Sequence, residues 1–329
     1  MKKRILGRTG LQVAELSLGG LFVSSFGGRG FDEASKAIHR ALDLGVNYID
    51  TAPGYADSET VLGKALHGVK KPYILSTKLG GRPQPFNPKD KDGLRKSVDE
   101  SLRLLGRDQI DILMIHEPDR PGQYDWWDDY EKFIGPVSEV LADLKRQGII
   151  KFTGLGGTTV YEMTRIIETG QFDVVLTAFN YSLLWQEARR FVVPAARKQK
   201  MGVIVGSPLH QGALAHRYDD DISSGALWMS TLRREQFKKL YAFLDETGIS
   251  LPEMGIRFVL SNPDVSAVLM GARSVDEVEQ NVAAAEKGPL PAGILARLQE
   301  IADMLPFRPY GEPAWVPMGS KGYKGPGML

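Results

Sequence analysis

The sequence contains no cysteine among its 329 residues. Disulfide frameworks, thiolate metal sites, iron–sulfur clusters and thiol nucleophiles are therefore excluded, because each of them needs a cysteine sulfur. The sequence also lacks any run approaching the ~20 apolar residues of a membrane span, and no apolar run of signal-peptide length follows its basic start. We therefore expect an unexported protein outside the membrane, and a cytoplasmic location suits the absence of cysteine.

An excess of charge of either sign is also missing, since 41 Lys and Arg residues are balanced by 40 Asp and Glu residues. A nucleic-acid-binding domain would show clustered basic residues and a high pI. No group of His and Asp residues has the spacing of a metal site. The expected partner is therefore a small molecule rather than a nucleic acid or a membrane, while assembly into a homo-oligomer stays open.

Short apolar runs recur along nearly the whole chain, and most are continuous, which is typical of strands covered on both faces in a parallel sheet. The eight runs span residues 14–18, 46–51, 73–78, 110–116, 149–155, 174–179, 203–206 and 265–270. Segments with helical periodicity lie between them, at residues 32–44, 91–105, 138–146, 161–168, 234–246 and 275–286. This alternation predicts a single domain over residues 1–329 with the (β/α)8 TIM barrel fold.

Three segments interrupt the alternation. A long loop follows the fourth strand at residues 117–134, another follows the seventh at residues 207–233, and an extended tail rich in Gly and Pro covers residues 306–329. Long loops in compact domains are usually functional or disordered. Residues 2–7 are expected to form a short hairpin beneath the barrel.

Four polar residues follow consecutive apolar runs. Asp50 ends the second run, Tyr55 lies in the loop after it, Lys78 ends the third run and His116 ends the fourth. Reactive groups of such a barrel lie at the carboxyl ends of its strands. Each residue alone is more often a turn former, a solvated charge or a packing residue, but neighbouring strands would place these groups roughly 5 Å apart. We therefore expect an acid, a phenol, an ammonium and an imidazole to share one mouth of the barrel.

This quartet predicts a proton-transfer site. A phenol ordinarily ionises near pH 10, and an ammonium ~4 Å away at an effective dielectric of ~20 would favour its ionised form by about 4 kcal/mol, or roughly three pKa units. On this reasoning Lys78 brings the pKa of Tyr55 near neutrality, Asp50 holds Lys78, and His116 orients a carbonyl oxygen. Such a site moves protons but supplies no electrons, so hydride must come from a nicotinamide cofactor.

The sequence offers no familiar dinucleotide motif for that cofactor. Residues 154–159 lack the last glycine of G-x-G-x-x-G, and no Walker A pattern exists. Barrels commonly bind phosphate with the loops after strands seven and eight, and the eighth strand here is followed by a helix start that carries Arg273. The alternative is that Ser274 and Glu277 form a capping box that stabilises this helix without any ligand.

These residues resemble the aldo-keto reductase superfamily over nearly the whole chain, in particular its bacterial sugar dehydrogenases and reductases. The resemblance is carried by residues 6–11, 47–52 with Tyr55, 76–78, 112–116, 179–184 and 271–274 with Asn281. It implies that Asp50, Tyr55, Lys78 and His116 form the catalytic tetrad, with Tyr55 as the general acid in reduction. It also implies an NAD(P)H-dependent oxidoreductase of the aldose dehydrogenase type, EC 1.1.1.-.

The resemblance further implies that a dinucleotide lies extended across the barrel mouth, in contact with Gly20, Leu21, Gly156, Gly157, Asn180, Ser207, Leu209, Gly271, Arg273, Glu277, Gln280 and Asn281. The usual nicotinamide contacts are missing at four positions, which hold Gly156, Gly157, Ala178 and Gly206. A substitute is expected from Asn180, Tyr181 or a loop tryptophan. NADP(H) is slightly favoured through Arg273, and NAD(H) stays open because Glu277 stands where several members have a basic residue.

All five tryptophans fall in segments expected at this mouth or in the tail, namely Trp126, Trp127, Trp185, Trp228 and Trp315. None of them has an evident role in the core. Aromatic faces beside polar loop groups suit a sugar or a sugar-derived aldehyde. The expected substrate contacts are therefore Tyr55, His116, Trp126, Trp127 and Trp228. An equally weighted alternative is a lid or a subunit interface packed with tryptophan.

Two other functions stay open. Lys78 could form a Schiff base in an aldolase or isomerase that binds a sugar phosphate through the same loops. Alternatively, the chain could be a non-catalytic, cofactor-sensing binding subunit, as some channel-associated proteins that resemble this family are. Turnover of a carbonyl substrate with a nicotinamide cofactor distinguishes the oxidoreductase from both.

Overall fold

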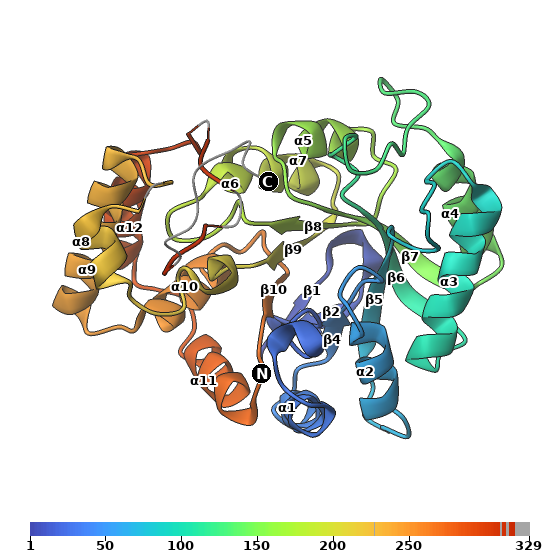
Figure 1. Ribbon diagram of the computed structural model, residues 1–329, viewed down its shortest axis with the longest axis horizontal. Helices are drawn as coiled ribbons and strands as arrows, with labels where there is room; N and C mark the ends of the chain where they lie inside the picture. Colours follow the sequence, from blue (N-terminus) through green and yellow to red (C-terminus); the bar gives the residue numbers. More distant parts are fainter. Residues whose placement is uncertain (227, 310, 314–315, 320–329) are drawn as a thin grey trace.

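The structure, a computed structural model, describes residues 1–226, 228–309, 311–313 and 316–319. Within these residues, eight parallel strands close into a central barrel in the order β10-β3-β4-β5-β6-β7-β8-β9 (Figure 1). Their bounds are β3 (Leu16–Gly19), β4 (Tyr48–Asp50), β5 (Ile74–Leu79), β6 (Ile110–His116), β7 (Ile150–Gly157), β8 (Val174–Ala178), β9 (Gly202–Gly206) and β10 (Ala267–Met270). The predicted (β/α)8 TIM barrel is confirmed.

Helices surround this barrel. In the described part of the chain they are α1 (Phe31–Asp43), α2 (Ser58–Ala65), α3 (Lys91–Leu105), α4 (Pro136–Arg146), α5 (Tyr161–Glu168), α6 (Glu187–Arg190), α7 (Val192–Lys198), α8 (Asp219–Ser224), α9 (Thr231–Thr247), α10 (Leu251–Leu260), α11 (Val275–Glu286) and α12 (Ala292–Asp303). Local chemistry sets their ends: α3 begins at an Asp90 cap and ends at the left-handed Gly106. Helices α8, α9 and α12 gather at one side of the barrel, on the left in Figure 1.

An antiparallel hairpin precedes the barrel strands. It pairs β1 (Lys3–Ile5) with β2 (Gln12–Ala14). The predicted hairpin is therefore present, but the prediction of one strand over residues 14–18 is wrong. Ala14 belongs to the hairpin, and Glu15 separates β2 from the first barrel strand.

Arg4 fixes the hairpin to the start of the last barrel strand. Its Nε donates to Glu15 Oε2 at 3.2 Å, and its Nη2 and Nη1 donate to the carbonyls of Leu260 at 2.6 Å and Val265 at 2.8 Å. Leu6, which follows β1, is fully buried against the residues that fill the barrel interior. The hairpin thus closes the amino-terminal end of the barrel and leaves the carboxyl end for chemistry.

The apolar core has two parts. Inward side chains fill the barrel, among them Tyr48, Ile112, Met114, Val174, Leu176, Ile204 and Leu269. A larger part lies between the strands and the helices. Burial on both faces explains why the strand runs are continuously apolar in the sequence. Among the residues described, no helix is both long enough and apolar enough to cross a membrane.

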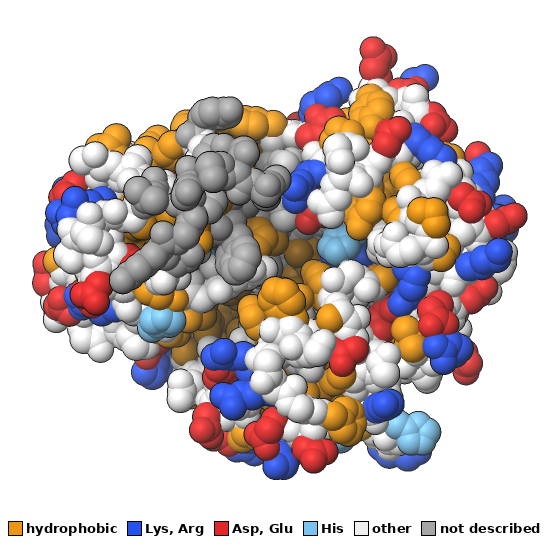
Figure 2. Space-filling view, in the orientation of Figure 1, with side chains coloured by type: hydrophobic (Ala, Val, Ile, Leu, Met, Phe, Trp, Pro, Cys, Tyr) orange, Lys and Arg blue, Asp and Glu red, His pale blue; other side chains and the backbone are white. Residues whose placement is uncertain are grey.

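The two long loops fall at the carboxyl ends of their strands, as predicted. One joins β6 to α4, and the other runs from β9 through the short helix α8 to α9. Figure 2 shows the molecular surface hollowed near the centre of the view, with hydrophobic side chains lining the depression.

Candidate active site

The four predicted catalytic residues lie at the carboxyl ends of three neighbouring strands. Asp50 is the last residue of β4, Lys78 lies near the end of β5 and His116 is the last residue of β6. These strands pair in parallel, so their ends come to the same level. Tyr55 lies in the loop between β4 and α2. The structure therefore brings these side chains together at one mouth of the barrel.

A buried ion pair joins Asp50 and Lys78. Lys78 Nζ lies 2.6 Å from Asp50 Oδ2 and donates to the carbonyl oxygen of Thr51 at 2.7 Å, and the two charged side chains are at most 2% exposed. The other oxygen of Asp50 accepts a hydrogen bond from Ser76 Oγ at 2.6 Å. Burial alone would lower the pKa of Lys78, but Asp50 and Tyr55 outweigh it, so the pKa is raised. Lys78 is therefore a fixed cation.

The Tyr55 ring packs against both Lys78 and His116. Lys78 Nζ lies over the ring, 4.7 Å from its centroid. The ring centroids of Tyr55 and His116 are 5.7 Å apart, and the rings meet edge to face at 80°. An ammonium at this distance is attracted by the ring quadrupole. The phenol, ammonium and imidazole therefore form one cluster, as the sequence predicts.

The prediction that Lys78 brings the pKa of Tyr55 near neutrality is wrong. Burial raises the pKa of this phenol by more than Lys78 lowers it, and Asp50 raises it further. The prediction from the sequence included the effect of the Lys78 ammonium on the pKa of Tyr55. It left out the burial of the phenol and the charge of Asp50, both of which raise that pKa. The protonated phenol is therefore the stable form at neutral pH, and this is the form that can donate a proton.

His116 is a neutral imidazole in this cluster. Burial lowers its pKa to about 3, and the positive charge of Lys78 adds to the effect. Its Nδ1 is buried and has no hydrogen-bond partner among the described residues. Its backbone carbonyl accepts a hydrogen bond from Trp126 Nε1 at 3.0 Å, which fixes the end of the strand. A neutral imidazole held in this way can hydrogen-bond to a substrate oxygen without taking its proton.

A second buried carboxylate, Glu117, directly follows His116 and is absent from the predicted site. It has a left-handed backbone with φ of 49°, and its Oε2 accepts a hydrogen bond from Thr158 Oγ1 at 2.6 Å. Burial raises its pKa more than the Thr158 hydrogen bond and the charge of Lys78 lower it. An acidic residue next to a strand-end histidine was the available signal in the sequence. Glu117 adds a hydrogen-bonding group beside the tetrad.

The glycine pair that ends β7 has a packing explanation. A Cβ on Gly157 would lie 2.3 Å from Asp119 Oδ1, and one on Gly156 would lie 3.2 Å from Lys78 Cε. Interiors this closely packed have no room for the first of these contacts. Asp119 is itself held by hydrogen bonds from two backbone N–H groups directly after β7. Packing against Lys78 and Asp119 therefore accounts for the two glycines, and Asp119 organises the loop after β7.

At the far end of the expected cofactor site, Arg273 is paired with Glu277. Its Nη2 and Nε lie 2.6 and 3.0 Å from Glu277 Oε1, and its backbone N donates to Oε2 at 2.8 Å. Burial would raise the pKa of Glu277, but the hydrogen bonds from Arg273 lower it, so the carboxylate stays ionised. Ser274 Oγ accepts from Glu277 N at 3.3 Å, so the cap is present, but the Glu277 carboxylate accepts from the backbone N of Arg273, not of Ser274, so only half of the expected capping box forms. The charge of Arg273 is thus neutralised by its neighbour.

Six of the other expected cofactor residues follow strand ends along one arc of the barrel mouth: Gly20 and Leu21 after β3, Asn180 after β8, Ser207 and Leu209 after β9, and Gly271 after β10. Gln280 and Asn281 lie within α11, the helix after β10. The arc is continuous because β7, β8, β9, β10 and β3 are successive neighbours in the barrel. Asn180 Nδ2 donates to the carbonyls of Thr158 at 2.7 Å and Ala178 at 3.0 Å, and so ties together the loops after β7 and β8.

The expectation that core packing explains none of the tryptophans is wrong. The four that the structure describes, Trp126, Trp127, Trp185 and Trp228, are all buried. Trp127, for example, packs edge to face on Phe133 and donates from Nε1 to the carbonyl of Pro118 at 2.9 Å. Buried rings leave little surface for a substrate, so the expected contacts from Trp126, Trp127 and Trp228 lack support. Trp315 lies outside the described residues.

Comparisons with known proteins identify the family of the chain. A sequence profile of the Aldo/keto reductase family matches residues 16–303. The chain is 30% identical over 290 residues to L-galactose dehydrogenase from Arabidopsis thaliana, covering 85% of this chain and 87% of that protein. It is 28% identical over 327 residues to D-threo-aldose 1-dehydrogenase from Pseudomonas sp, covering 88% and 94%.

A solved structure gives the same result. The aldo-keto reductase AKR11C1 from Bacillus halodurans, in its holo form, is 26% identical with a TM-score of 0.73, and the match covers 98% of this chain and 99% of that one. The barrel, the clustered strand-end residues and the sequence matches are thus consistent with one another. The chain belongs to the aldo/keto reductase family and is an oxidoreductase that interconverts carbonyl and alcohol groups with a nicotinamide cofactor.

Proposed function

We propose that this enzyme oxidises an aldose, or reduces a sugar-derived aldehyde, with Tyr55 as the general acid and base. The observation that carries the proposal is the buried pair of Asp50 and Lys78 against the Tyr55 ring, 4.7 Å from the ammonium. This pair keeps a positive charge beside the phenol that must lose its proton. The sugar dehydrogenases among the relatives support the class of substrate.

In the reducing direction, the Tyr55 hydroxyl donates its proton to the carbonyl oxygen as that oxygen gains negative charge. Lys78 stabilises the phenolate that remains, and neutral His116 hydrogen-bonds to the same substrate oxygen. In the oxidising direction, the phenolate of Tyr55 accepts the proton of the alcohol. When bound, the nicotinamide supplies or accepts the hydride.

The residues along the mouth fit a dinucleotide. At one end, Gly156 contributes only backbone beside Lys78, since a Cβ there would lie 3.2 Å from Lys78 Cε. At the other end, the carboxylate of Glu277 suits ribose hydroxyls, as acidic residues do in other dinucleotide sites, whereas it would repel a 2′-phosphate. The sequence slightly favoured NADP(H) through Arg273. The ion pair between Arg273 and Glu277 leaves less positive charge for a 2′-phosphate, and we propose that the enzyme prefers NAD(H) over NADP(H).

The geometry disfavours Lys78 as a Schiff-base nucleophile. A lysine of that kind must be neutral to attack a carbonyl. Here the ammonium is bound to Asp50 and to the carbonyl of Thr51, and its pKa is raised. In the proposed oxidoreductase, Lys78 instead acts as a permanent positive charge beside Tyr55.

Initial rates test the proposal. The enzyme is assayed with a panel of aldoses and NAD+ or NADP+, and with simple aldehydes and the reduced cofactors, by the absorbance of the nicotinamide. We expect oxidation of at least one aldose, with NAD+ used better than NADP+. Cofactor binding without turnover on any aldose or aldehyde would instead indicate a cofactor-sensing binding subunit.

Replacing Tyr55 tests its role directly. Tyr55→Phe is expected to lower kcat by about 10² to 10⁴ without changing the dissociation constant of the cofactor, because only the proton transfer is removed. Tyr161→Phe, at an exposed tyrosine, is the matched control and should leave kcat unchanged. Full activity of Tyr55→Phe would remove Tyr55 from the mechanism.

A further inference from the structure

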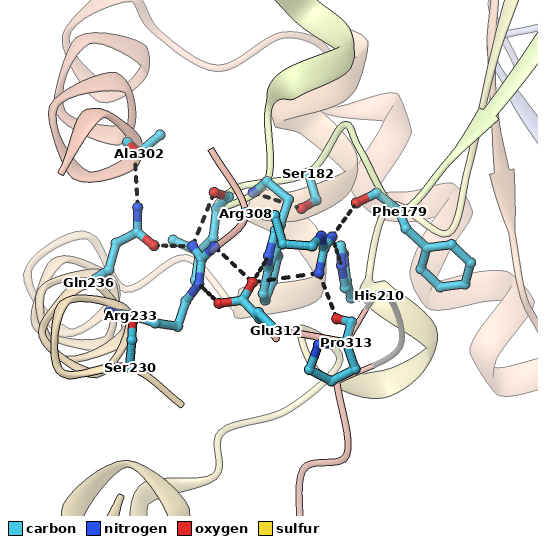
Figure 3. Close-up of polar contacts among 12 residues, drawn as sticks. Phe179, Ser182, His210, Ser230, Arg233, Gln236, Ala302, Arg308, Glu312 and Pro313 are labelled. Carbon is cyan, nitrogen blue, oxygen red and sulfur yellow. Dashed lines mark hydrogen bonds and ion pairs between the residues drawn. The ribbon is translucent and has the colours of Figure 1, made fainter. Parts of the chain in front are cut away.

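A buried ionic cluster holds the C-terminal segment, by which we mean the described residues between 306 and 319, against the barrel mouth (Figure 3). Its centre is the carboxylate of Glu312, whose two oxygens each accept a hydrogen bond from Arg233 at 2.9 Å. Trp185 Nε1 donates to the same carboxylate at 2.5 Å. The side chains of Arg233 and Glu312 are at most 2% exposed. One carboxylate therefore joins α9, the loop after β8 and the C-terminal segment.

Arg308 extends this cluster to the two loops beside the proposed cofactor site. Its Nη2 donates to the carbonyl of Phe179 at 3.0 Å and lies 3.3 Å from His210 Nε2. Its Nη1 donates to the carbonyl of Pro313 at 2.7 Å and lies 3.5 Å from Glu312 Oε1. Phe179 directly follows β8, and His210 lies in the loop after β9. A single guanidinium thus holds both loops (Figure 3).

The loops that Arg308 holds have backbone conformations that need support. Four of their non-glycine residues have positive φ, between 49° and 65°: Phe179, Ser207, His210 and Gln211. Side chains disfavour this conformation, and it persists only where the surroundings fix it. The His210 ring stacks on the buried Trp185 ring with centroids 3.9 Å apart. The contacts of Arg308 and Trp185 are therefore what hold these turns in place.

We propose that Arg308 and Glu312 are positioning residues that preorganise the loops after β8 and β9 for the dinucleotide. The inference rests on the proposed function, which places the cofactor along these loops. Glu312 fixes Arg308, and Arg308 fixes the carbonyl of Phe179. This turn directs Asn180, whose Nδ2 donates to the carbonyl of Thr158 in the neighbouring loop after β7. Preorganisation of this kind lowers the cost of binding without any contact to the reacting atoms.

Arg308→Met tests the proposal, because it removes the guanidinium and keeps an apolar side chain. We expect the dissociation constant of NADH or NADPH, measured by the fluorescence of the bound cofactor, to rise at least tenfold. The KM for the cofactor should rise with it, while kcat at saturating cofactor stays within threefold. A residue with only a structural role would lower Tm without separating KM from kcat in this way.

Arg190→Met is the matched control. Arg190 also joins the segment after β8 to the C-terminal region, through an ion pair with Asp303 at 2.6 Å and a contact with the Phe307 ring, but this pair is exposed to solvent. We expect it to leave the dissociation constant unchanged. Glu312→Gln keeps an acceptor for Trp185 and loses the charge, and it should raise the dissociation constant at least threefold.

The outcomes separate the two proposals. Equal dissociation constants for the wild type and Arg308→Met would overturn the positioning role and leave the proposed function intact. If the wild type binds neither NADH nor NADPH, the proposed function falls and this inference falls with it. Should Arg308→Met not fold, Arg308→Lys keeps the charge and loses the planar fork, and it is expected to show the same separation of KM from kcat.

Discussion

Removing the charges of Asp50 and Lys78 one at a time and together separates stability from catalysis. Lys78→Met leaves the Asp50 carboxylate buried, with the Ser76 hydroxyl as its one remaining side-chain partner among the described residues. Breaking a buried pair in this way costs about 3–5 kcal/mol. An unfolding entropy of about 2.1 cal/mol/K per residue makes each kcal/mol roughly 1.4 °C for a chain of this length, so Tm should fall by about 4–7 °C.

The double substitution Lys78→Met with Asp50→Asn removes both charges and should recover most of the lost stability. Replacing a buried ion pair by neutral groups of similar size is often close to neutral, so Tm should return to within about 2 °C of the wild type. Activity should not return, because Tyr55 then lacks the cation that stabilises its phenolate. The double variant is thus expected to be nearly as stable as the wild type and yet inactive.

Thermal unfolding followed by circular dichroism, together with initial rates, measures both quantities. Arg40→Met is the control, since Arg40 pairs with Glu279 at 2.7 Å on the surface, and exposed pairs contribute little. Its Tm should stay within about 1 °C of the wild type. If the double variant is as unstable as Lys78→Met, the two charges are not coupled and the reasoning fails. Wild-type turnover in the double variant would refute the role given to Lys78.

The remaining predictions concern pH and cofactor choice. Because burial raises the pKa of Tyr55, the phenolate needed for alcohol oxidation is scarce at neutral pH. The oxidation rate should therefore rise by up to about tenfold per pH unit from pH 7 towards pH 10, whereas carbonyl reduction stays flat from pH 6 to 9; an oxidation plateau beginning near pH 7 would contradict this. Glu277→Gln frees Arg273 for a 2′-phosphate and should raise the ratio of kcat/KM for NADPH over NADH at least tenfold. Glu279 is exposed on the same helix, and Glu279→Gln should leave that ratio unchanged. If the two variants have the same ratio of kcat/KM for NADPH over NADH, the role given to Glu277 is wrong.

The positions of the tetrad could be predicted from the sequence because they depend on local rules. A polar residue that ends an apolar run must lie at the carboxyl end of a barrel strand, and Asp50, Lys78 and His116 do so. The pKa of Tyr55 could not be predicted, because it is a balance between lost water and three neighbouring charges. Side-chain packing sets that balance, and packing cannot be inferred from the order of residues along one strand.

Other features of the structure were missed. Helix α10 was missed although its buried residues Leu251, Met254, Gly255, Phe258 and Val259 recur at helical spacing, so the signal was present in the sequence. Glu117 has a left-handed backbone and accepts a hydrogen bond from Thr158, 41 positions later, and neither feature can be predicted from the residues around it. The pair of Arg233 and Glu312 joins residues 79 positions apart, and no short-range pattern links them.

The late position of Arg308 and Glu312 has a consequence for synthesis on the ribosome. A nascent chain that has emerged as far as Asp303 already contains all eight barrel strands and the four residues of the tetrad. It still lacks Arg308, whose guanidinium donates a hydrogen bond to the carbonyl of Phe179, 129 positions earlier. The barrel strands can therefore pair before Arg308 and Glu312 are available to secure the loops after β8 and β9.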